Sequence, residues 1–261
     1  IHPYWEFGDH DKRDQRDPNL LAGELCELVI QAVRRQTRGS IPYAVPLSGG
    51  YDSRSILCSM RRLYPNQPIR TVTWGDEDHR PESDVMVAQH LAEHYKTSHS
   101  FYRLDAGALP RHFRDFVLTS EGRMDAAGNY PEGLGMLQRI QKDLGVNLLF
   151  RGNEFFGARS GVDRYKQALY VGFLPTFRMQ PASFRYLNRS SYRFLADLSD
   201  TQMQRIMAGY PYDSFIDRKD HLFISERFYA YHNPLTQLKR LVTEERNPLL
   251  DNDIIDFVRH L

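Results

Sequence analysis

The chain has 261 residues, of which 41% are hydrophobic and 26% charged, and its 34 lysines and arginines nearly balance 33 aspartates and glutamates. This length and composition predict a globular chain with a full core. They exclude a membrane-spanning class, because no apolar run approaches the roughly 18 residues that cross a bilayer. The net charge of +1 gives no overall attraction to nucleic acid. Because its start has no signal-peptide character, we expect the chain in the cytoplasm.

The two cysteines, Cys26 and Cys58, occur inside helical patterns and show no C-x-x-C spacing. This arrangement argues against a disulfide framework and against a zinc site. We expect both thiols to be reduced and to lie in the core.

Residues 1–19 are polar, with four aspartates among basic neighbours, and are interpreted as a connecting arm. Apolar residues then recur at helical spacing between residues 20 and 36, which predicts an amphipathic helix. Because the chain lacks an initiator methionine and stops inside an apparent helix at residues 257–261, we expect a fragment of a longer protein.

The letters YAVPLSGGYDSRSIL at residues 43–57 predict a strand, a tight loop and a helix. Two adjacent glycines allow the positive φ angles that turn successive N–H groups toward one point. A helix that begins near Ser53 directs its free N–H groups and its positive dipole end to the same place. Phosphate fits such a site, with added hydrogen bonds from the Ser48 and Ser53 hydroxyls. One carboxylate together with phosphate oxygens commonly holds Mg²⁺, so Asp52 makes this a candidate metal–nucleotide loop.

The letters of this loop exclude other nucleotide-binding classes. The loop lacks the lysine of G-x-x-x-x-G-K-[ST], and it contains neither G-x-G-x-x-G nor G-x-S-x-G. Kinase and dehydrogenase classes are therefore not supported.

Strands and helices alternate after the loop. A strand at residues 69–74, a helix at 82–95 and a strand at 97–104 predict an α/β fold, with a doubly wound, mostly parallel sheet and helices on both faces. Ligands of such sheets bind at the carboxyl ends of strands, where the loop and Trp74 both lie. Trp74 either stacks on an adenine or fills the core.

Helices at residues 109–119 and 131–144 precede a short buried strand at 146–150. The letters RGNEFFG at residues 151–157 follow as a polar, glycine-bounded turn. A polar turn at the carboxyl end of a strand is a second place for active-site groups.

The remaining chain is predicted to be helical between residues 160 and 232 and to end in a helix that begins near Asn252. Basic and aromatic residues alternate between Arg159 and Arg193. This strip either faces RNA or is a solvated helical face whose aromatic side chains point inward.

Three segments together resemble the synthetase domain of glutamine-hydrolysing asparagine synthetase, a member of the ATP pyrophosphatase superfamily related to β-lactam synthetase and the lasso-peptide cyclases. They are LSGGYDS at residues 47–53, GNEFFG at 152–157 and EERNPLLD at 244–251. The resemblance implies a nucleotide-binding core at residues 20–158 and a helical remainder of the same domain at 159–261. It also implies ATP and Mg²⁺ as cofactors.

The resemblance further implies a set of site residues. Trp74 would flank the adenine, Asp52 and Asn153 would hold Mg²⁺, and Lys239, Arg246 and Glu154 would have catalytic roles. The residues that would bind ATP and pyrophosphate are Leu47, Ser48, Gly49, Gly50, Asp52, Ser53 and Gly152.

The chain departs from the family pattern at three positions. Asn153 replaces a second Mg²⁺-binding aspartate, Phe150 replaces a catalytic glutamate, and Thr236 replaces a lysine that stabilises departing pyrophosphate. Lys239, one helical turn later, either takes over from that lysine or faces solvent. Arg246 either acts in catalysis or pairs with an acidic neighbour, Glu244 or Asp251.

The expected function is ATP-dependent amide-bond formation through an acyl-adenylate. The partners would be a small-molecule or peptide carboxylate and an amine donor, either ammonia from a glutaminase domain outside this chain or an amine within the substrate. No membrane partner is expected, and nucleic acid is the less favoured partner. The alternatives are a catalytically weakened nucleotide sensor or scaffold, an intramolecular cyclase of the lasso-peptide or β-lactam type, and a tRNA-modifying enzyme.

Overall fold

A computed structural model of the protein describes residues 14–39, 41–76, 80–122, 130, 132, 134–153, 187–208 and 214–261. The contacts of the chain form two compact units. Residues 13–154 and 233–261 make up one unit, and residues 1–12 and 155–232 make up the other. The boundary near residue 158 that the sequence suggests stays a prediction.

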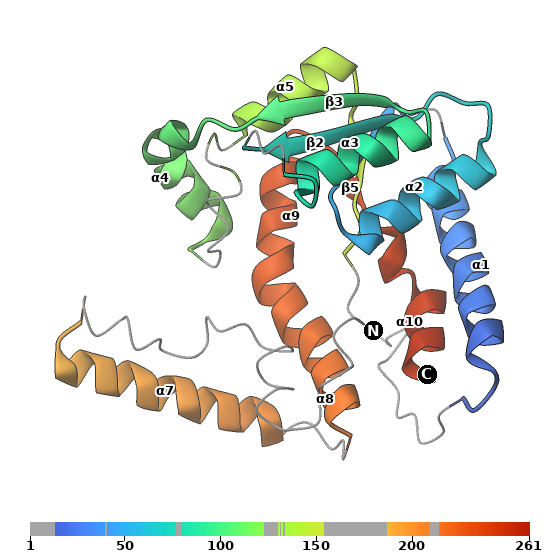
Figure 1. Ribbon diagram of the computed structural model, residues 1–261. Helices are drawn as coiled ribbons and strands as arrows, with labels where there is room; N and C mark the ends of the chain where they lie inside the picture. The colour runs from blue at the N-terminus through green and yellow to red at the C-terminus, as the bar shows by residue number, and fades with distance from the viewer. Residues whose placement is uncertain are drawn as a thin grey trace. The chain divides into compact units, whose positions relative to one another are not determined.

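The first unit contains a five-stranded sheet in the order β3-β2-β1-β4-β5, in which every paired strand is parallel. This confirms the predicted fold class. The strands are β1 (Tyr43–Pro46), β2 (Arg70–Gly75), β3 (Ser98–Arg103), β4 (Leu148–Phe150) and β5 (Glu244–Arg246). The neighbouring strands β2 and β3 lie side by side in Figure 1. The chain runs outward from β1 to β3 and then crosses to β4 on the other side of β1. That reversal creates the switch point at which open parallel sheets bind ligands, outside the carboxyl ends of β1 and β4.

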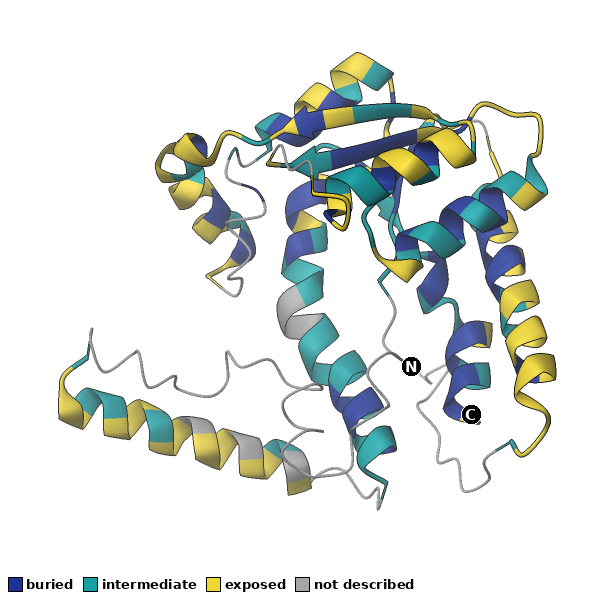
Figure 2. Cartoon of the chain, in the orientation of Figure 1, coloured by how far each residue is buried: buried dark blue, intermediate teal, exposed yellow. Residues whose placement is uncertain are grey.

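Helices cover both faces of the sheet. One face is covered by α1 (Pro18–Gln36), α2 (Tyr51–Leu63) and α3 (Asp84–His94), and the other by α4 (Leu109–Ser120), α5 (Gly135–Leu144) and α9 (Asn233–Arg240). Because side chains alternate along a strand, Phe150 packs in the first core layer and Leu149 in the second. Figure 2 shows the resulting pattern on α1, with buried residues along one side and exposed residues along the other.

Two short elements and one helix complete this unit. A single helical turn, η1 (Ala106–Ala108), leads into α4, and another, η6 (Pro248–Leu250), follows β5. The last helix, α10 (Asn252–Arg259), packs beside α1. The final helix therefore begins at the predicted residue.

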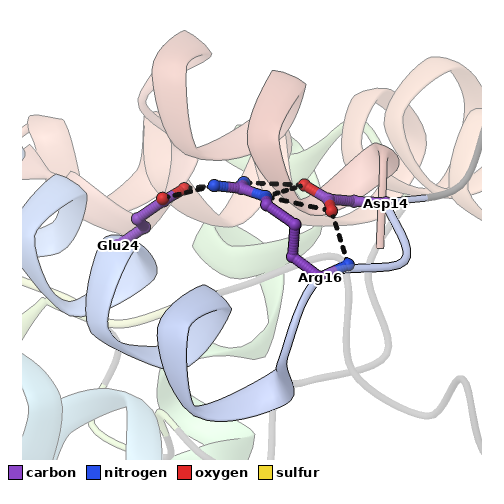
Figure 3. Close-up of polar contacts among 3 residues, drawn as sticks. All are labelled: Asp14, Arg16 and Glu24. Atoms are coloured by element: carbon purple, nitrogen blue, oxygen red, sulfur yellow. Dashed lines mark hydrogen bonds and ion pairs between the residues drawn. The ribbon is translucent and has the colours of Figure 1, made fainter.

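The start of α1 is fixed by polar contacts. The Asp17 carboxylate accepts a hydrogen bond from the Asn19 N–H at 2.7 Å and caps the helix. Arg16 forms ion pairs with Asp14 at 2.7 Å and with Glu24 at 2.6 Å (Figure 3), and it lowers the pKa of the Asp14 carboxyl. The end of the expected connecting arm is thus joined to α1, whereas residues 1–13 lie outside the described residues.

Three local expectations differ from the structure. The strand β5 was not predicted, because the letters EER show no apolar alternation and the strand exists only through its pairing with β4. The helix α2 begins at Tyr51, two residues before the predicted start, since Gly50 is already its N-cap. Cys26 is exposed and not in the core: it lies on the same side of α1 as Val29 and Val33, but before Val29 only Leu21 is buried on this helix.

The second unit is helical wherever it is described. Its elements are α7 (Arg189–Ala208), α8 (Phe215–Leu222) and η5 (Phe223–His232), the last of which has the wider π-helical turn. Most of the basic and aromatic strip at 159–193 lies outside the described residues. Within the described part of the chain, no helix combines the length and the apolarity that crossing a membrane requires.

Candidate active site

The glycine bend, residues 47–53, connects the carboxyl end of β1 to α2. Leu47 is buried and donates its N–H to the Val72 carbonyl at 2.8 Å. The Ser48 N–H donates to Ser53 Oγ at 3.2 Å, and the Gly50 N–H donates to Ser48 Oγ, also at 3.2 Å. The serine hydroxyls therefore hold the bend in shape.

The outer side of the bend faces solvent. Gly50 is exposed, and Tyr51 at the first position of α2 is 80% exposed. The first N–H groups of α2 have no partner within the helix and carry its positive dipole end. The bend is therefore open to an anionic group from outside.

A carboxylate that the sequence did not single out lies against the bend. Asp84, the first residue of α3, accepts a hydrogen bond from the Gly49 N–H at 2.8 Å. A Cβ atom at Gly49 would lie 2.6 Å from the same Asp84 oxygen. A side chain at this position would therefore require the Asp84 carboxylate to move, and the hydrogen bond shows that the Gly49 amide is directed at a carboxylate oxygen.

The second predicted loop meets the first at the backbone. A Cβ atom at Gly152 would lie 2.6 Å from both the carbonyl carbon and the Cβ of Asp52. Next to it, the Asn153 N–H donates to Asn247 Oδ1 at 3.3 Å, and Asn247 Nδ2 donates to the Asn153 carbonyl at 2.9 Å. The three motif segments thus converge at the carboxyl ends of β1, β4 and β5.

The convergence of Asp52 and Asn153 fits a magnesium ion that is shared with a nucleotide. The two side chains contain one carboxylate and one amide oxygen, and the Asn153 backbone N–H and carbonyl are both engaged by Asn247. No group of three or more His, Cys, Asp and Glu side chains occurs within the described ranges. Mg²⁺ with few protein ligands takes phosphate and water oxygens for the remainder. Glu154, the proposed substitute ligand and catalytic residue, lies outside the described residues.

The profile of the asparagine synthase family matches residues 24–227. The chain belongs to the asparagine synthase family. The match covers the glycine bend and the GNEFFG loop, and membership supports an ATP-dependent ligase type of function.

Individual relatives are more distant. The chain is 26% identical over 135 residues to the protein named Amidase chry2 of Gibberella zeae, in a match that covers 46% of this chain and 20% of that protein. The matched part of the chain therefore corresponds to about a fifth of this relative's length.

Two solved structures are similar at low identity. A U34-tRNA thiolase from Methanococcus maripaludis is 14% identical, with a TM-score of 0.39 over 94% of this chain and 82% of that one. An NH3-dependent NAD synthetase from Campylobacter jejuni is 14% identical, with a TM-score of 0.38 over 82% of this chain and 96% of that one.

Phe150, one of the departures from the family pattern, and Trp74, the predicted neighbour of the adenine, both contact the core. Phe150 is fully buried and packs edge-to-face on Tyr43, with ring centroids 5.2 Å apart. Trp74 is half-buried against the core and lies 6.4 Å from the Tyr130 ring. Phe150 is thus a core residue whose side chain cannot act as an acid or a base. Part of the Trp74 side chain packs against the core.

The two candidate catalytic cations, Arg246 and Lys239, are both paired within the protein. Arg246 forms an ion pair with Glu244 at 2.9 Å and donates to the Gln36 carbonyl, as the structural alternative predicted. Lys239 is 1% exposed and forms an ion pair with Glu245 at 2.9 Å. The expectation of a solvent-facing lysine is therefore wrong, because α9 packs this position against β5.

Glu245 is a buried carboxylate that the sequence reasoning missed. Burial raises its pKa to about 7, while Arg151 and a hydrogen bond from Thr236 favour its ionised form. Burial also raises the pKa of the neighbouring Tyr130 hydroxyl to about 12. The only available sequence signal was a second acidic residue in the EERNPLLD segment.

A polar cavity lies at the carboxyl ends of β2 and β3. Its volume is about 580 Å³. Its lining includes Asp76, Arg103, Asp105, Gly107, Glu132 and Arg139. The cavity offers both signs of charge at the same edge of the sheet as the glycine bend.

Proposed function

We propose that this protein forms an amide bond at the expense of ATP, through an acyl-adenylate and with release of AMP and pyrophosphate. The observation that carries this proposal is the meeting of Gly152 with Asp52 at the switch point of the sheet. It places the glycine bend, a carboxylate and the Asn153 amide together in a chain of the asparagine synthase family.

The chemistry assigned to these residues is mainly binding and charge stabilisation. The substrate carboxylate attacks the α-phosphorus of ATP, the bond to the β-phosphate oxygen breaks, and pyrophosphate leaves. An amine then attacks the acyl carbon, AMP leaves, and the amine loses a proton. The first N–H groups of α2 and the hydroxyls of Ser48 and Ser53 would stabilise the leaving phosphates, whereas the N–H groups of Ser48, Gly49 and Gly50 donate within the protein and hold the bend in shape.

Mg²⁺, held by Asp52 and Asn153, would supply positive charge to the phosphate oxygens. Asn153 contributes no negative charge, so we infer a weaker metal site than two carboxylates would give. Lys239 and Arg246 are engaged in ion pairs, and the proposal therefore assigns the main role to the bend itself.

The substrate classes are part of this proposal. We infer a small-molecule or peptide carboxylate as the acid and ammonia or a primary amine as the acceptor. The amine would come from a glutaminase part of a longer protein or from the substrate itself. A cytoplasmic location fits the requirement for ATP.

An ATP–pyrophosphate exchange assay with a panel of carboxylates tests the proposal. Exchange should depend on one class of acid, and Asp52→Asn should reduce it by about 100-fold or more, as expected for loss of a group that acts on the developing charge. Asp115→Asn on the exposed side of α4 is the matched control and should leave exchange unchanged. No exchange with any carboxylate at saturating Mg-ATP would refute the proposal.

A second candidate function is nucleotide binding without turnover, as a sensor or scaffold. The burial of Phe150 favours it, because the family's catalytic carboxylate is absent from that position. Calorimetry that detects tight ATP binding without AMP production would support this function, and rapid AMP production would exclude it.

A further inference from the structure

A cluster of charged side chains is buried on the α9 side of the sheet. Lys239 Nζ lies 2.9 Å from Glu245 Oε1, and the same oxygen lies 3.5 Å from Arg151 Nη1. The side chains become more exposed in that order, at 1% for Lys239, 7% for Glu245 and 22% for Arg151. Arg151 is therefore the member of the cluster that solvent and ligands reach.

The cluster contains more positive than negative charge. Its two cations share one carboxylate, and Glu245 is the one acidic side chain paired with either cation within the described ranges. Lys239 Nζ makes no well-aligned hydrogen bond in the described part of the chain, and its other neighbour is the face of the Tyr130 ring at 5.5 Å. Burying charge without a partner is unfavourable, so the excess of positive charge among these described side chains favours the binding of a further anionic group.

The position of Arg151 decides where that anion lies. Its N–H donates to the Arg246 carbonyl at 2.9 Å, which fixes the backbone at the end of β4. The next residue, Gly152, packs against Asp52 of the glycine bend. Arg151 thus lies one residue from the contact between the two loops that the proposed function uses.

Arg246 provides the internal comparison. It is on the same strand as Glu245, yet its guanidinium already contacts the Glu244 carboxylate and the Gln36 carbonyl. Among the described residues, Arg151 has one carboxylate partner, Glu245, and shares it with a buried lysine. Of Arg151 and Arg246, Arg151 is the one whose charge is less fully matched among the described residues.

We propose that Arg151 binds an anionic oxygen group of the ligand beside the glycine bend, and that Glu245 and Lys239 are positioning residues that hold its guanidinium. The group is either the carboxylate of the acid substrate or the α-phosphate of the nucleotide, both of which a guanidinium binds through two parallel hydrogen bonds. The functional meaning of this site rests on the proposed ligase activity, whereas anion binding can be measured without it.

Thermal unfolding of the whole chain in sodium acetate, sodium phosphate and sodium chloride at equal ionic strength tests the inference. A bound anion raises the melting temperature in proportion to its occupancy of the folded state. Acetate, phosphate or both should stabilise the wild type more than chloride does. Arg151→Met should raise the half-saturating concentration of that anion by about tenfold or more, and Arg151→Lys should retain part of the response.

Arg62→Met is the matched control, because Arg62 pairs with Glu27 at the surface of α2. Its anion response should equal that of the wild type. Glu245→Gln should raise the half-saturating concentration severalfold, and Glu245→Asp should partly restore it. If Glu245 had only a structural role, Glu245→Gln would lower the melting temperature without changing the half-saturating anion concentration.

The outcomes separate the two sources of the anion. Loss of the acetate response in Arg151→Met identifies a carboxylate site, and loss of the phosphate response alone identifies a nucleotide-phosphate site. Equal responses in wild type and Arg151→Met, or no specific response in the wild type, would overturn the inference. A failed exchange assay with an intact anion response would remove the ligase proposal and leave the anion site standing.

Discussion

At the scale of single residues, Lys239 and Glu245 depend on each other. Both are buried; without Glu245 the Lys239 ammonium would have no carboxylate partner among the described residues, and without Lys239 the Glu245 carboxylate would lose its nearest cation. Their interaction links α9 to β5 directly, through side chains that the apolar pattern of either element does not predict. Removing one partner is therefore more harmful than the loss of a surface ion pair.

We expect Lys239→Met to lower the free energy of unfolding by about 3 kcal/mol, because it leaves the buried Glu245 carboxylate with the more distant Arg151 and the Thr236 hydrogen bond. Urea denaturation measures this. Lys142→Met on the exposed side of α5 is the control and should change stability by less than about 0.5 kcal/mol. Equal denaturation midpoints for the two variants would contradict the assignment.

His99 gives the fold a dependence on pH. Burial lowers its pKa below the ordinary value of 6.5, and its Nδ1 lies 3.0 Å from Thr71 Oγ1. The unfolded chain therefore takes up a proton on His99 before the folded chain does, so stability is lost as the pH falls through 6.5.

His99→Gln should flatten the decline in stability between pH 7.5 and pH 5, pH values chosen to span the ordinary histidine pKa of about 6.5. Urea midpoints at the two pH values measure the slope. His90→Gln on the exposed side of α3 should keep the wild-type slope. An unchanged slope in His99→Gln would show that other groups cause the decline.

At the scale of elements, the site depends on two loops that touch because one of them has no side chain. Gly152 approaches Asp52 so closely that any Cβ atom would overlap backbone atoms. Backbone cannot move aside as the end of a flexible side chain can. The spacing between the β1 and β4 loops is therefore set by this glycine.

Gly152→Ala should separate the loops, lower stability by about 1–3 kcal/mol and abolish ATP binding. Calorimetry with Mg-ATP and urea denaturation measure the two effects. Gly23→Ala in α1 is the control and should raise stability. Nothing lies within 4 Å of the added atom, and alanine favours a helix over glycine by about 0.5–1 kcal/mol. Wild-type ATP affinity in Gly152→Ala would rule out the loop contact as part of the site.

At the scale of the whole molecule, we expect the protection of backbone amides from hydrogen exchange to follow the order of the strands in the sheet. The central strand β1 is paired on both sides and contains the fully buried Ala44 and Val45, whereas β3 is an edge strand that includes the exposed Phe101. Hydrogen exchange should therefore be slowest in β1 and β4 and faster in β3. The result would be contradicted if the amides of β3 exchanged as slowly as those of β1.

Local patterns in the sequence were sufficient for most of the sheet unit. Apolar spacing predicted α1, α3 and β2 to within two residues, and the double glycine marked the bend. These features follow from interactions between near neighbours in the chain, which composition and periodicity report directly. The order of the motifs was likewise enough to suggest the family.

Only the tertiary structure decided the rest of the site. Residues 244–246 form a strand because they pair with the free edge of β4. This pairing directs Glu245 inward toward Lys239. Asp84 reaches Gly49 across 35 positions of the chain. Such contacts are set by how helices pack on the two faces of the sheet. The sequence by itself therefore determined the α/β alternation and the glycine bend, and the packing determined which charges meet beside that bend.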